Sequence, residues 1–254
     1  MEKSLDFRFE IPRTPDGLLI EFSAGEMEKY LLKNLAEAGT DSTKELWQLA
    51  QFYKLSNQHD KALQRLRELL QRLPDPEDKA ECVFTMGQTM EQVGDYRAAV
   101  RYYKEAFALE PAHTFTWYFI HNNLGFSLNS LGDFTEGEVY CRKAIEIDPE
   151  RPNAHKNLGI ALTSQGRHRQ AAHAFVAATQ ANAADNRAFG LLKALLKQHS
   201  DLADEFQEML VLCERAVEAA AQKIEVAKPV VHRGWRKHLI LVWLKLRSIL
   251  RPRR

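Results

Sequence analysis

Two asparagines, Asn123 and Asn157, have the residue type and the spacing that best indicate a chemistry for this chain. Each stands directly before a Leu-Gly pair, and the two lie 34 residues apart. Because a side-chain amide both donates and accepts hydrogen bonds, a row of such amides can hold the backbone of an extended peptide with little dependence on its sequence. The same asparagines could instead satisfy nearby helix carbonyls or water, so a binding role and a structural role are both open.

No catalytic or metal-binding pattern accompanies these amides. The sequence lacks a His-Glu-x-x-His pair, a phosphate-binding glycine loop, a dinucleotide-binding glycine fingerprint and a nucleophile elbow. His168 and His173 are five residues apart and so lie on different faces of a predicted helix, while Glu136 and Glu138 are interpreted as ordinary surface charge. We predict a non-enzymatic protein without metal or cofactor. In the absence of a Cys-x-x-Cys pair, the cysteines are expected to be buried, reduced thiols: Cys82, Cys141 and Cys213.

Six glycines at a fixed register indicate the elements that position the asparagines. They form three pairs, each with a spacing of seven residues, within units of about 34 residues, and such a period is typical of stacked helical repeats. The first glycine of a pair lies on the apolar face of a predicted helix, where it lets a partner helix approach closely. The second, replaced by Asn57 in the first unit, favours the left-handed conformation that ends a helix. The pairs are Gly87 and Gly94, Gly125 and Gly132, and Gly159 and Gly166.

Each unit predicts a helical hairpin. Its second helix repeats small, large and small residues along one face, a pattern that lets antiparallel helices interdigitate. Pro74, Pro111 and Pro149 end this helix in the first three units, because proline cannot continue it. The units begin at Thr43, Ala80, Tyr118 and Pro152. The three columns are Ala62, Ala99, Gly137 and Ala171; Leu66, Tyr103, Cys141 and Phe175; and Leu69, Ala106, Ala144 and Ala178.

These columns resemble the tetratricopeptide repeat family, whose pattern is a bulky residue, Leu-Gly, Tyr, Ala, Phe, Ala and a closing Pro. The match covers residues 43–185 and is strongest over 83–111 and 121–149. The first unit lacks the glycine, the fourth lacks the proline, and two linkers are three or four residues too long. The resemblance implies an all-α solenoid, wound as a right-handed superhelix, with a groove lined mainly by the first helix of each unit. The predicted repeats are 43–76, 80–113, 118–151 and 152–185.

The resemblance and the register together imply that amides and aromatics dominate this groove. Asn123 and Asn157 resemble the asparagine ladder in the repeats of O-linked N-acetylglucosamine transferase, whose catalytic domain is absent here. Gln48 and Thr85 occupy the same column in the earlier units, so the ladder has two rungs. A chaperone-type carboxylate clamp is disfavoured, because only two groove residues are basic. The expected groove residues are Trp47, Gln48, Gln51, Lys54, Phe84, Thr85, Gln88, Glu91, Asn122, Asn123, Phe126, Asn129, Lys156, Asn157, Ile160 and Thr163.

Residues 1–42 precede the repeats and follow a different pattern. Apolar and polar residues alternate over 5–11, and a turn-rich segment leads to residues 18–22, which predicts a short β-hairpin. This hairpin would cap the first repeat or offer an edge to another chain. A helix is expected over 24–38, and Ser42 with Glu45 resembles a capping box that opens the first repeat. Beyond the repeats, apolar stripes over 189–196 and 202–221 predict capping helices within 186–221.

Residues 222–254 are predicted to form a basic amphipathic tail. From Lys228 to Arg254 there are nine Lys or Arg and no Asp or Glu, whereas the remaining chain has a net charge of −8. The stretch is too short and too charged to span a bilayer, but a basic helix with tryptophans can lie in a membrane interface. Packing on the acidic body, a subunit contact, nucleic-acid binding and an inert tail are the alternatives. The tail residues expected to make the contact are Arg233, Trp235, Arg236, Lys237, Trp243, Lys245 and Arg247.

The composition, with 45% hydrophobic and 27% charged residues, is typical of a water-soluble and mostly helical chain. Met1 to Glu10 lacks the apolar core of a signal peptide, so we expect a cytoplasmic protein that can also be peripheral at a membrane. The predicted function is a non-enzymatic interaction scaffold that holds a partner's segment in the groove, while the tail aids docking at a membrane surface or on a partner. An RNA-associated adaptor that uses the basic, aromatic tail is the alternative.

Overall fold

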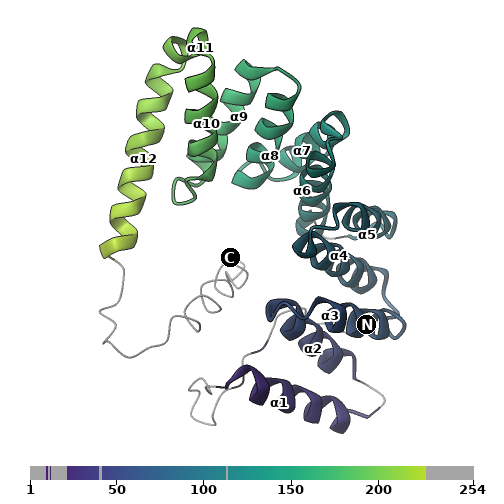
Figure 1. Ribbon diagram of the computed structural model, residues 1–254. Helices are drawn as coiled ribbons and strands as arrows, with labels where there is room; N and C mark the ends of the chain where they lie inside the picture. Colours follow the sequence, from purple (N-terminus) through teal and green to yellow (C-terminus); the bar gives the residue numbers. More distant parts are fainter. Residues whose placement is uncertain (1–9, 11, 13–21, 40–41, 113, 227–254) are drawn as a thin grey trace. The chain divides into compact units, whose positions relative to one another are not determined.

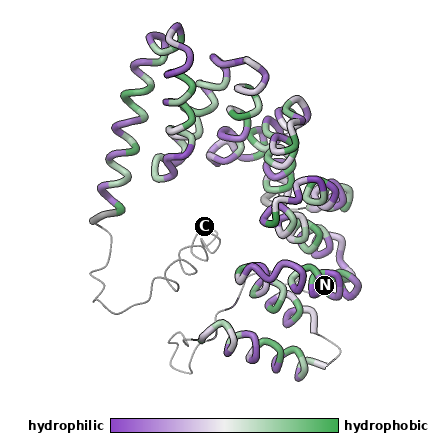
Figure 2. Tube along the Cα trace, viewed as in Figure 1, coloured by the Kyte–Doolittle hydropathy of each residue, from purple (hydrophilic) through white to green (hydrophobic). Residues whose placement is uncertain are grey.

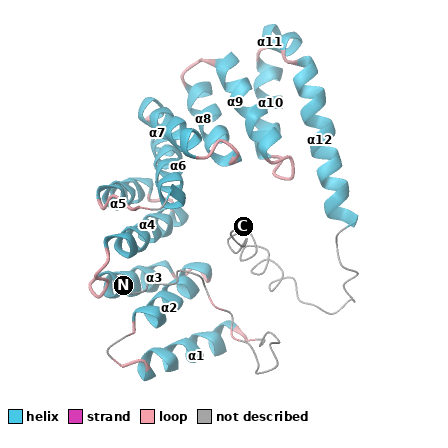
Figure 3. Ribbon diagram, turned by 180° about the vertical axis from the view of Figure 1, so that it is seen from behind, coloured by secondary structure: helices cyan, strands magenta, loops and turns pink. Residues whose placement is uncertain are grey.

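The computed structural model describes residues 10, 12, 22–39, 42–112 and 114–226, and every regular element in these ranges is a helix (Figure 1). Short turns join most of the helices (Figure 3). The expected all-α fold of helical hairpins is confirmed, while the predicted β-hairpin lies almost entirely outside the described residues. The helices are α1 (Ala24–Glu37), α2 (Thr43–Leu55), α3 (His59–Leu70), α4 (Pro76–Val93), α5 (Tyr96–Ala108), α6 (Thr114–Leu131), α7 (Phe134–Ile147), α8 (Pro152–Ser164), α9 (His168–Ala181), α10 (Arg187–Gln198), α11 (Ser200–Glu205) and α12 (Gln207–Val226).

The described helices divide into two compact units. The first holds α1, α2, α3 and α4 as far as Thr89, and the second holds the end of α4 from Met90 together with α5 to α12. Each of the two compact units has its own buried core.

In the first unit, α1 packs on the first hairpin. Leu31 of α1 is buried with Leu49, Phe52 and Tyr53 of α2 and with Ala62 of α3. Polar contacts join the same elements, because Glu28 of α1 accepts hydrogen bonds from the Tyr53 hydroxyl and the Lys61 ammonium, both at 2.9 Å. The segment before the repeats therefore covers the apolar side of the first hairpin.

The capping box predicted at Ser42 and Glu45 is wrong, and one occurs at α1 instead. Ser42 precedes α2 with φ −111° and ψ 20°, outside the extended region that a capping serine normally adopts, and its side chain makes no cap hydrogen bond. Its hydroxyl accepts a hydrogen bond from Arg72. Before α1, Ser23 is extended, and it exchanges hydrogen bonds reciprocally with Glu26.

The turns between paired helices follow the predicted chemistry. Asn57, Gly94, Gly132 and Gly166 have φ values of 59°, 85°, 88° and 74°, the left-handed conformation that these residue types adopt at low cost. Gly159 confirms the role of the earlier glycines, since an added Cβ would lie 2.6 Å from Cδ1 of the Phe175 ring. The hairpin α8–α9 therefore depends on the missing side chain.

Two first helices begin earlier than the sequence pattern indicated. The sequence pattern starts the second and third repeats at Ala80 and Tyr118, but α4 begins at Pro76 and α6 at Thr114. Both helices have 18 residues, whereas α2 and α8 have 13 and begin at the expected positions. The residues interpreted as over-long linkers form an extra helical turn. Pro76 favours this start, because proline suits the first turn of a helix.

In the second compact unit, the apolar core extends beyond the four repeats to the helices that follow them. Phe175 and Val176 of α9 are buried together with Leu192 and Leu195 of α10 and with Cys213 of α12. Hydrophobic and hydrophilic stretches alternate along these helices, as expected when one face of each is buried (Figure 2). The stripe predicted over 202–221 is divided between α11 and α12, with Phe206 between them.

Candidate peptide-binding surface

The asparagines predicted to lie in the groove are on α6 and α8, the first helices of the third and fourth repeats. They form one hydrogen-bonded row. Nδ2 of Asn129 donates to the backbone oxygen of Asn157 at 2.8 Å, and Nδ2 of Asn157 donates to Oδ1 of Asn122 at 3.1 Å. Asn122 in turn donates to Oδ1 of Asn123 at 2.9 Å. All four side chains are buried, at 9% exposure or less. Two repeats are thus joined through amides, one of which satisfies a helix carbonyl as the structural interpretation required.

Two further residues extend this row into the preceding repeat. Nδ2 of Asn123 donates to the Tyr103 hydroxyl at 3.2 Å, and this hydroxyl donates to Oε2 of Glu91 at 2.8 Å. We call the whole series the amide relay, consisting of Glu91, Tyr103, Asn122, Asn123, Asn129 and Asn157. Burial, followed by the charge of Glu91, raises the pKa of Tyr103 well above its ordinary value, so the phenol keeps the proton that it donates.

Sequence reasoning did not place Tyr103 in a polar role. Its column also contains Leu66, Cys141 and Phe175, and this pattern predicts a packing role alone. The hydroxyl was the available signal, because a buried tyrosine oxygen usually has a hydrogen-bond partner. Gly137 supports the relay from the opposite helix, since a Cβ at this position would collide with Oδ1 of Asn129.

Two side-chain oxygen atoms of the relay are left without a hydrogen bond. Within the described chain, Oδ1 of Asn129 and Oδ1 of Asn157 have no hydrogen-bond donor. Each hydrogen bond of the relay joins a donor on one residue to an acceptor on the next, so the orientation of each amide depends on its neighbours. The result is a set of side chains whose directions are determined by their neighbours in the row.

The groove residues predicted in the first compact unit lie on α2 and α4, the first helices of the first and second repeats. Lys54 of α2 donates to Oε1 of Gln88 of α4 at 2.8 Å, and Oε1 of Gln48 accepts the backbone N–H of Glu10 at 2.8 Å. Gln51 is half-buried. Three further predicted groove residues on these helices are buried, with exposed fractions of 4% or less: Trp47, Phe84 and Thr85.

The remaining groove candidates lie on α6 and α8. Phe126 is half-buried, with its ring edge-on to Tyr96 at a centroid distance of 5.8 Å. Lys156 is half-buried beside Asn157, and burial lowers its pKa, as does the nearby Arg187, while Asp185 acts in the opposite direction. Ile160 and Thr163 are also half-buried, and the Thr163 hydroxyl bonds to its own helix.

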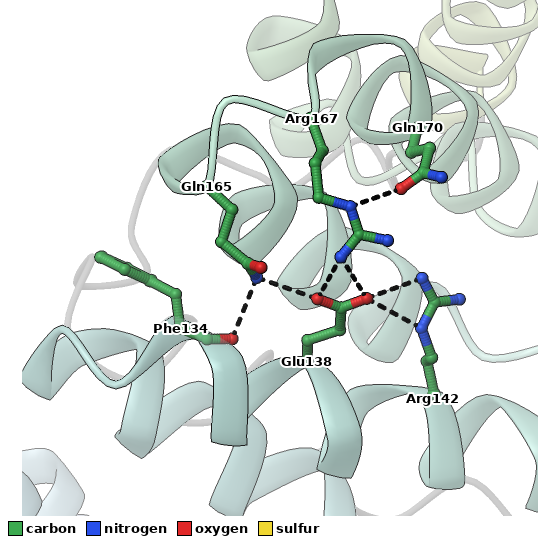
Figure 4. A network of polar contacts seen from close by, with 6 residues as sticks. All are labelled: Phe134, Glu138, Arg142, Gln165, Arg167 and Gln170. Carbon is green, nitrogen blue, oxygen red and sulfur yellow. Dashed lines mark hydrogen bonds and ion pairs between the residues drawn. The ribbon is translucent and has the colours of Figure 1, made fainter.

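Glu138 is the centre of a polar network that sequence reasoning missed (Figure 4). Its carboxylate accepts hydrogen bonds from Arg142 at 2.8 Å, from Arg167 at 2.6 Å and from Gln165 at 2.9 Å. Burial by itself raises the pKa of Glu138, but these hydrogen bonds outweigh it and lower the pKa. The interpretation as ordinary surface charge is therefore wrong. Because Gln165 and Arg167 flank Gly166, the network fastens the turn of the fourth repeat to α7.

His121 and the three cysteines are buried. The ring of His121 of α6 stacks with the rings of Trp117 and Tyr140, at centroid distances of 5.6 Å and 5.8 Å. The cysteines are buried and unpaired, and burial raises the pKa of Cys82 and of Cys141 to about 12, so these two thiols stay protonated. Across the described ranges, no group of three or more His, Cys, Asp or Glu could hold a metal ion.

The predicted tail contact lies outside the described residues, which end at Val226. α12 continues five residues into the range assigned to the tail. Among the described helices, none is long and apolar enough to cross a bilayer.

Comparison with known proteins places these helices in a family. Two tetratricopeptide repeat models match residues 42–110 and 128–196, which together form more than half of the chain. Among curated proteins, none has a matching sequence. The structure of BtubC (BKLC) from P. vanneervenii is similar over 85% of this chain and 98% of BtubC, with a TM-score of 0.66 and 18% identity.

MamA structures are also similar. MamA 41-end from Desulfovibrio magneticus RS-1 matches 74% of this chain and 98% of its own length, with a TM-score of 0.55 and 15% identity. The MamA RS-1 ArsTM double mutant matches 70% of this chain and 98% of its own length, with a TM-score of 0.56 and 19% identity. At such identities the likeness concerns the fold, and it agrees with the repeat matches. The chain belongs to the tetratricopeptide repeat family.

Proposed function

We propose that this protein is a non-enzymatic scaffold that binds an extended segment of a partner protein along α6 and α8. Family membership supports the general part of the proposal, since helical repeats form extended surfaces for protein partners. The amide relay supports the specific part. Its side chains come from consecutive repeats and orient one another, as a surface that binds backbone groups at regular intervals requires.

The relay is expected to act through pre-organisation. An isolated surface asparagine loses rotamer freedom when it binds a peptide, whereas the relay asparagines are already ordered. The left-over amide oxygen of Asn157 can accept an N–H group from a peptide backbone once the peptide displaces a neighbouring side chain. Lys54 and Gln88 of the first unit are proposed to contribute a similar polar contact there.

Peptide selection on the full chain tests this function. From a random twelve-residue library we expect extended binders, and Asn123→Ala together with Asn157→Ala should weaken them at least tenfold, because each lost hydrogen bond costs about 1 kcal/mol or more. Binding is measured by fluorescence anisotropy, and circular dichroism checks that the variant remains folded. Asn153→Ala is the matched control, an asparagine of α8 outside the relay.

Two outcomes would contradict the proposal at different levels. If the folded double variant retains every binder at full affinity, the relay does not hold the peptide. If the wild-type chain selects no peptide, the binding function itself is wrong.

We further propose that residues 222–254 place the scaffold at an anionic membrane surface. The supporting observation is the sequence of the tail, in which Trp235 and Trp243 accompany the nine Lys and Arg residues between Lys228 and Arg254. Each nearby cation can contribute ~1 kcal/mol against anionic lipid. The chain should therefore sediment with phosphatidylserine vesicles at low salt and lose this binding when residues 230–254 are deleted. Tail-dependent retention of RNA without vesicle binding would instead support the adaptor alternative.

A further inference from the structure

Lys156 carries a positive charge that no acidic side chain of the described residues pairs with directly. It is half-buried on α8, directly before Asn157 of the amide relay. Its ammonium makes no hydrogen bond or ion pair with any residue that the structure describes. A buried cation is normally paired, because removal from water penalises the charged form. The position therefore maintains a charge at a cost to the free protein.

Asp185, the acid whose charge acts on Lys156, is already engaged. Asp185 accepts both the Nε of Arg187 at 2.8 Å and the Nη2 of Arg187 at 2.5 Å, so this carboxylate forms a bidentate pair. Arg187 is also the first residue of α10, and the amino end of a twelve-residue helix adds positive potential. Two side-chain cations and a helix terminus thus face a single carboxylate, which leaves a surplus positive charge around Lys156.

We propose that Lys156 recognises one Asp or Glu side chain of the bound partner segment, while the nearby Arg187 adds to the positive potential. This inference rests on the proposed function, because the carboxylate would arrive with the peptide that the relay orders. Lys156 and Asn157 are consecutive on α8, and their side chains point about 100° apart, so the carboxylate-bearing residue lies within a few residues of the backbone group that Asn157 contacts. One carboxylate matches the surplus of one charge, which favours a single acidic position over an acidic run.

The selection experiment tests this preference directly when the library has amidated C termini. Binders of the wild-type full chain should share Asp or Glu at one aligned position, and its replacement by Asn or Gln should weaken binding about tenfold. With Lys156→Gln, the acidic and amide peptides should bind equally. Lys156→Glu should select Lys or Arg at the same position. Lys197→Gln, which removes an exposed lysine of α10, is the matched control and should keep the acidic preference.

A second measurement separates recognition from folding. Because Lys156→Gln removes an unpaired, half-buried charge, it should leave the melting temperature unchanged or raise it. In nuclear magnetic resonance of ¹³C-methylated lysines, the acidic peptide should raise the pKa of Lys156, and the amide peptide should not.

Each contrary result has a distinct meaning. Binders without a shared acidic position, or an acidic preference that survives Lys156→Gln, would overturn the Lys156 assignment and leave the scaffold proposal standing. Binding only by peptides with a free C-terminal carboxylate would also overturn it, since the source would then be the chain end. A chain that selects no peptide would overturn the proposed function first.

Discussion

Replacing Gly159 by valine should lower the free energy of unfolding by about 3 kcal/mol, at the upper end of the range for an overpacked core. Gly159 lies on α8 against the ring of Phe175, which is 2% exposed. The first carbon of any side chain would lie 2.6 Å from Cδ1 and 2.9 Å from Cζ of that ring. A buried ring has no free space to enter, so α8 and α9 would have to separate.

Urea unfolding followed by circular dichroism measures this effect. Gly190→Ala is the matched control, because Gly190 lies on α10 with no atom within 4 Å of an added Cβ. That variant should stabilise the chain by about 0.5–1 kcal/mol through helix propensity. Phe175→Leu should recover part of the Gly159→Val loss, since the two residues share one contact. An unfolding curve of Gly159→Val that matches wild type would refute the close approach of α8 and α9.

Acidification should destabilise the protein through His121. Burial, followed by the charge of Lys143, lowers the pKa of this imidazole to about 4. In the unfolded chain its pKa is about 6.5, so between these values the unfolded state binds more protons than the folded state. Stability is therefore lost as pH falls from about 6.5 to about 4. The loss from this group is on the order of 3 kcal/mol once both states are protonated.

The cause is the aromatic environment of His121. Trp117 and Tyr140 stack on the ring and Phe107 meets it edge-on at 5.6 Å, so the charged form has little access to water. His121→Gln should remove this part of the pH dependence, measured as the difference between urea unfolding free energies at pH 7 and pH 4. His155→Gln, on α8 and outside the aromatic cluster, should retain it. Equal acid losses in wild type and His121→Gln would exclude His121 as the source.

Much of the fold follows from residues whose effect is local. Gly94, Gly132, Gly166 and Asn57 end helices because of their own backbone preferences, so their turns could be predicted from spacing alone. The small-large-small columns also hold, since Ala99, Tyr103 and Ala106 and their equivalents are buried as the register requires. The repetition made these positions predictable, because the same residue types recur at the same register in each repeat.

The polar contacts could not be predicted in the same way, because they join residues from different elements. Glu138 contacts Arg167 across 29 positions, and Asn123 contacts Tyr103 across 20. Periodicity identifies which residues share a face, but it does not say which partner a long polar side chain reaches. The same limit explains Ser42, where the serine suggested a cap and Arg72 binds its hydroxyl instead.

The relay also explains why the sequence alone left the asparagines open to two interpretations. Asn129 satisfies a carbonyl of α8, as the structural interpretation held, yet the amides also orient one another in a row. These roles are compatible, since a side chain that is ordered by its neighbours loses less entropy when a ligand binds.

Site-specific photocrosslinking tests most directly whether a partner segment binds along the first helices. The photoreactive residue benzoylphenylalanine is placed in the full chain at Phe126 of α6, at Ile160 of α8, or at Val139 of α7, which is 49% exposed and serves as the control. A peptide selected on the wild-type chain is expected to crosslink at Phe126 and Ile160 and not at Val139. Crosslinking at Val139, with none at Phe126 or Ile160, would contradict the proposed binding surface.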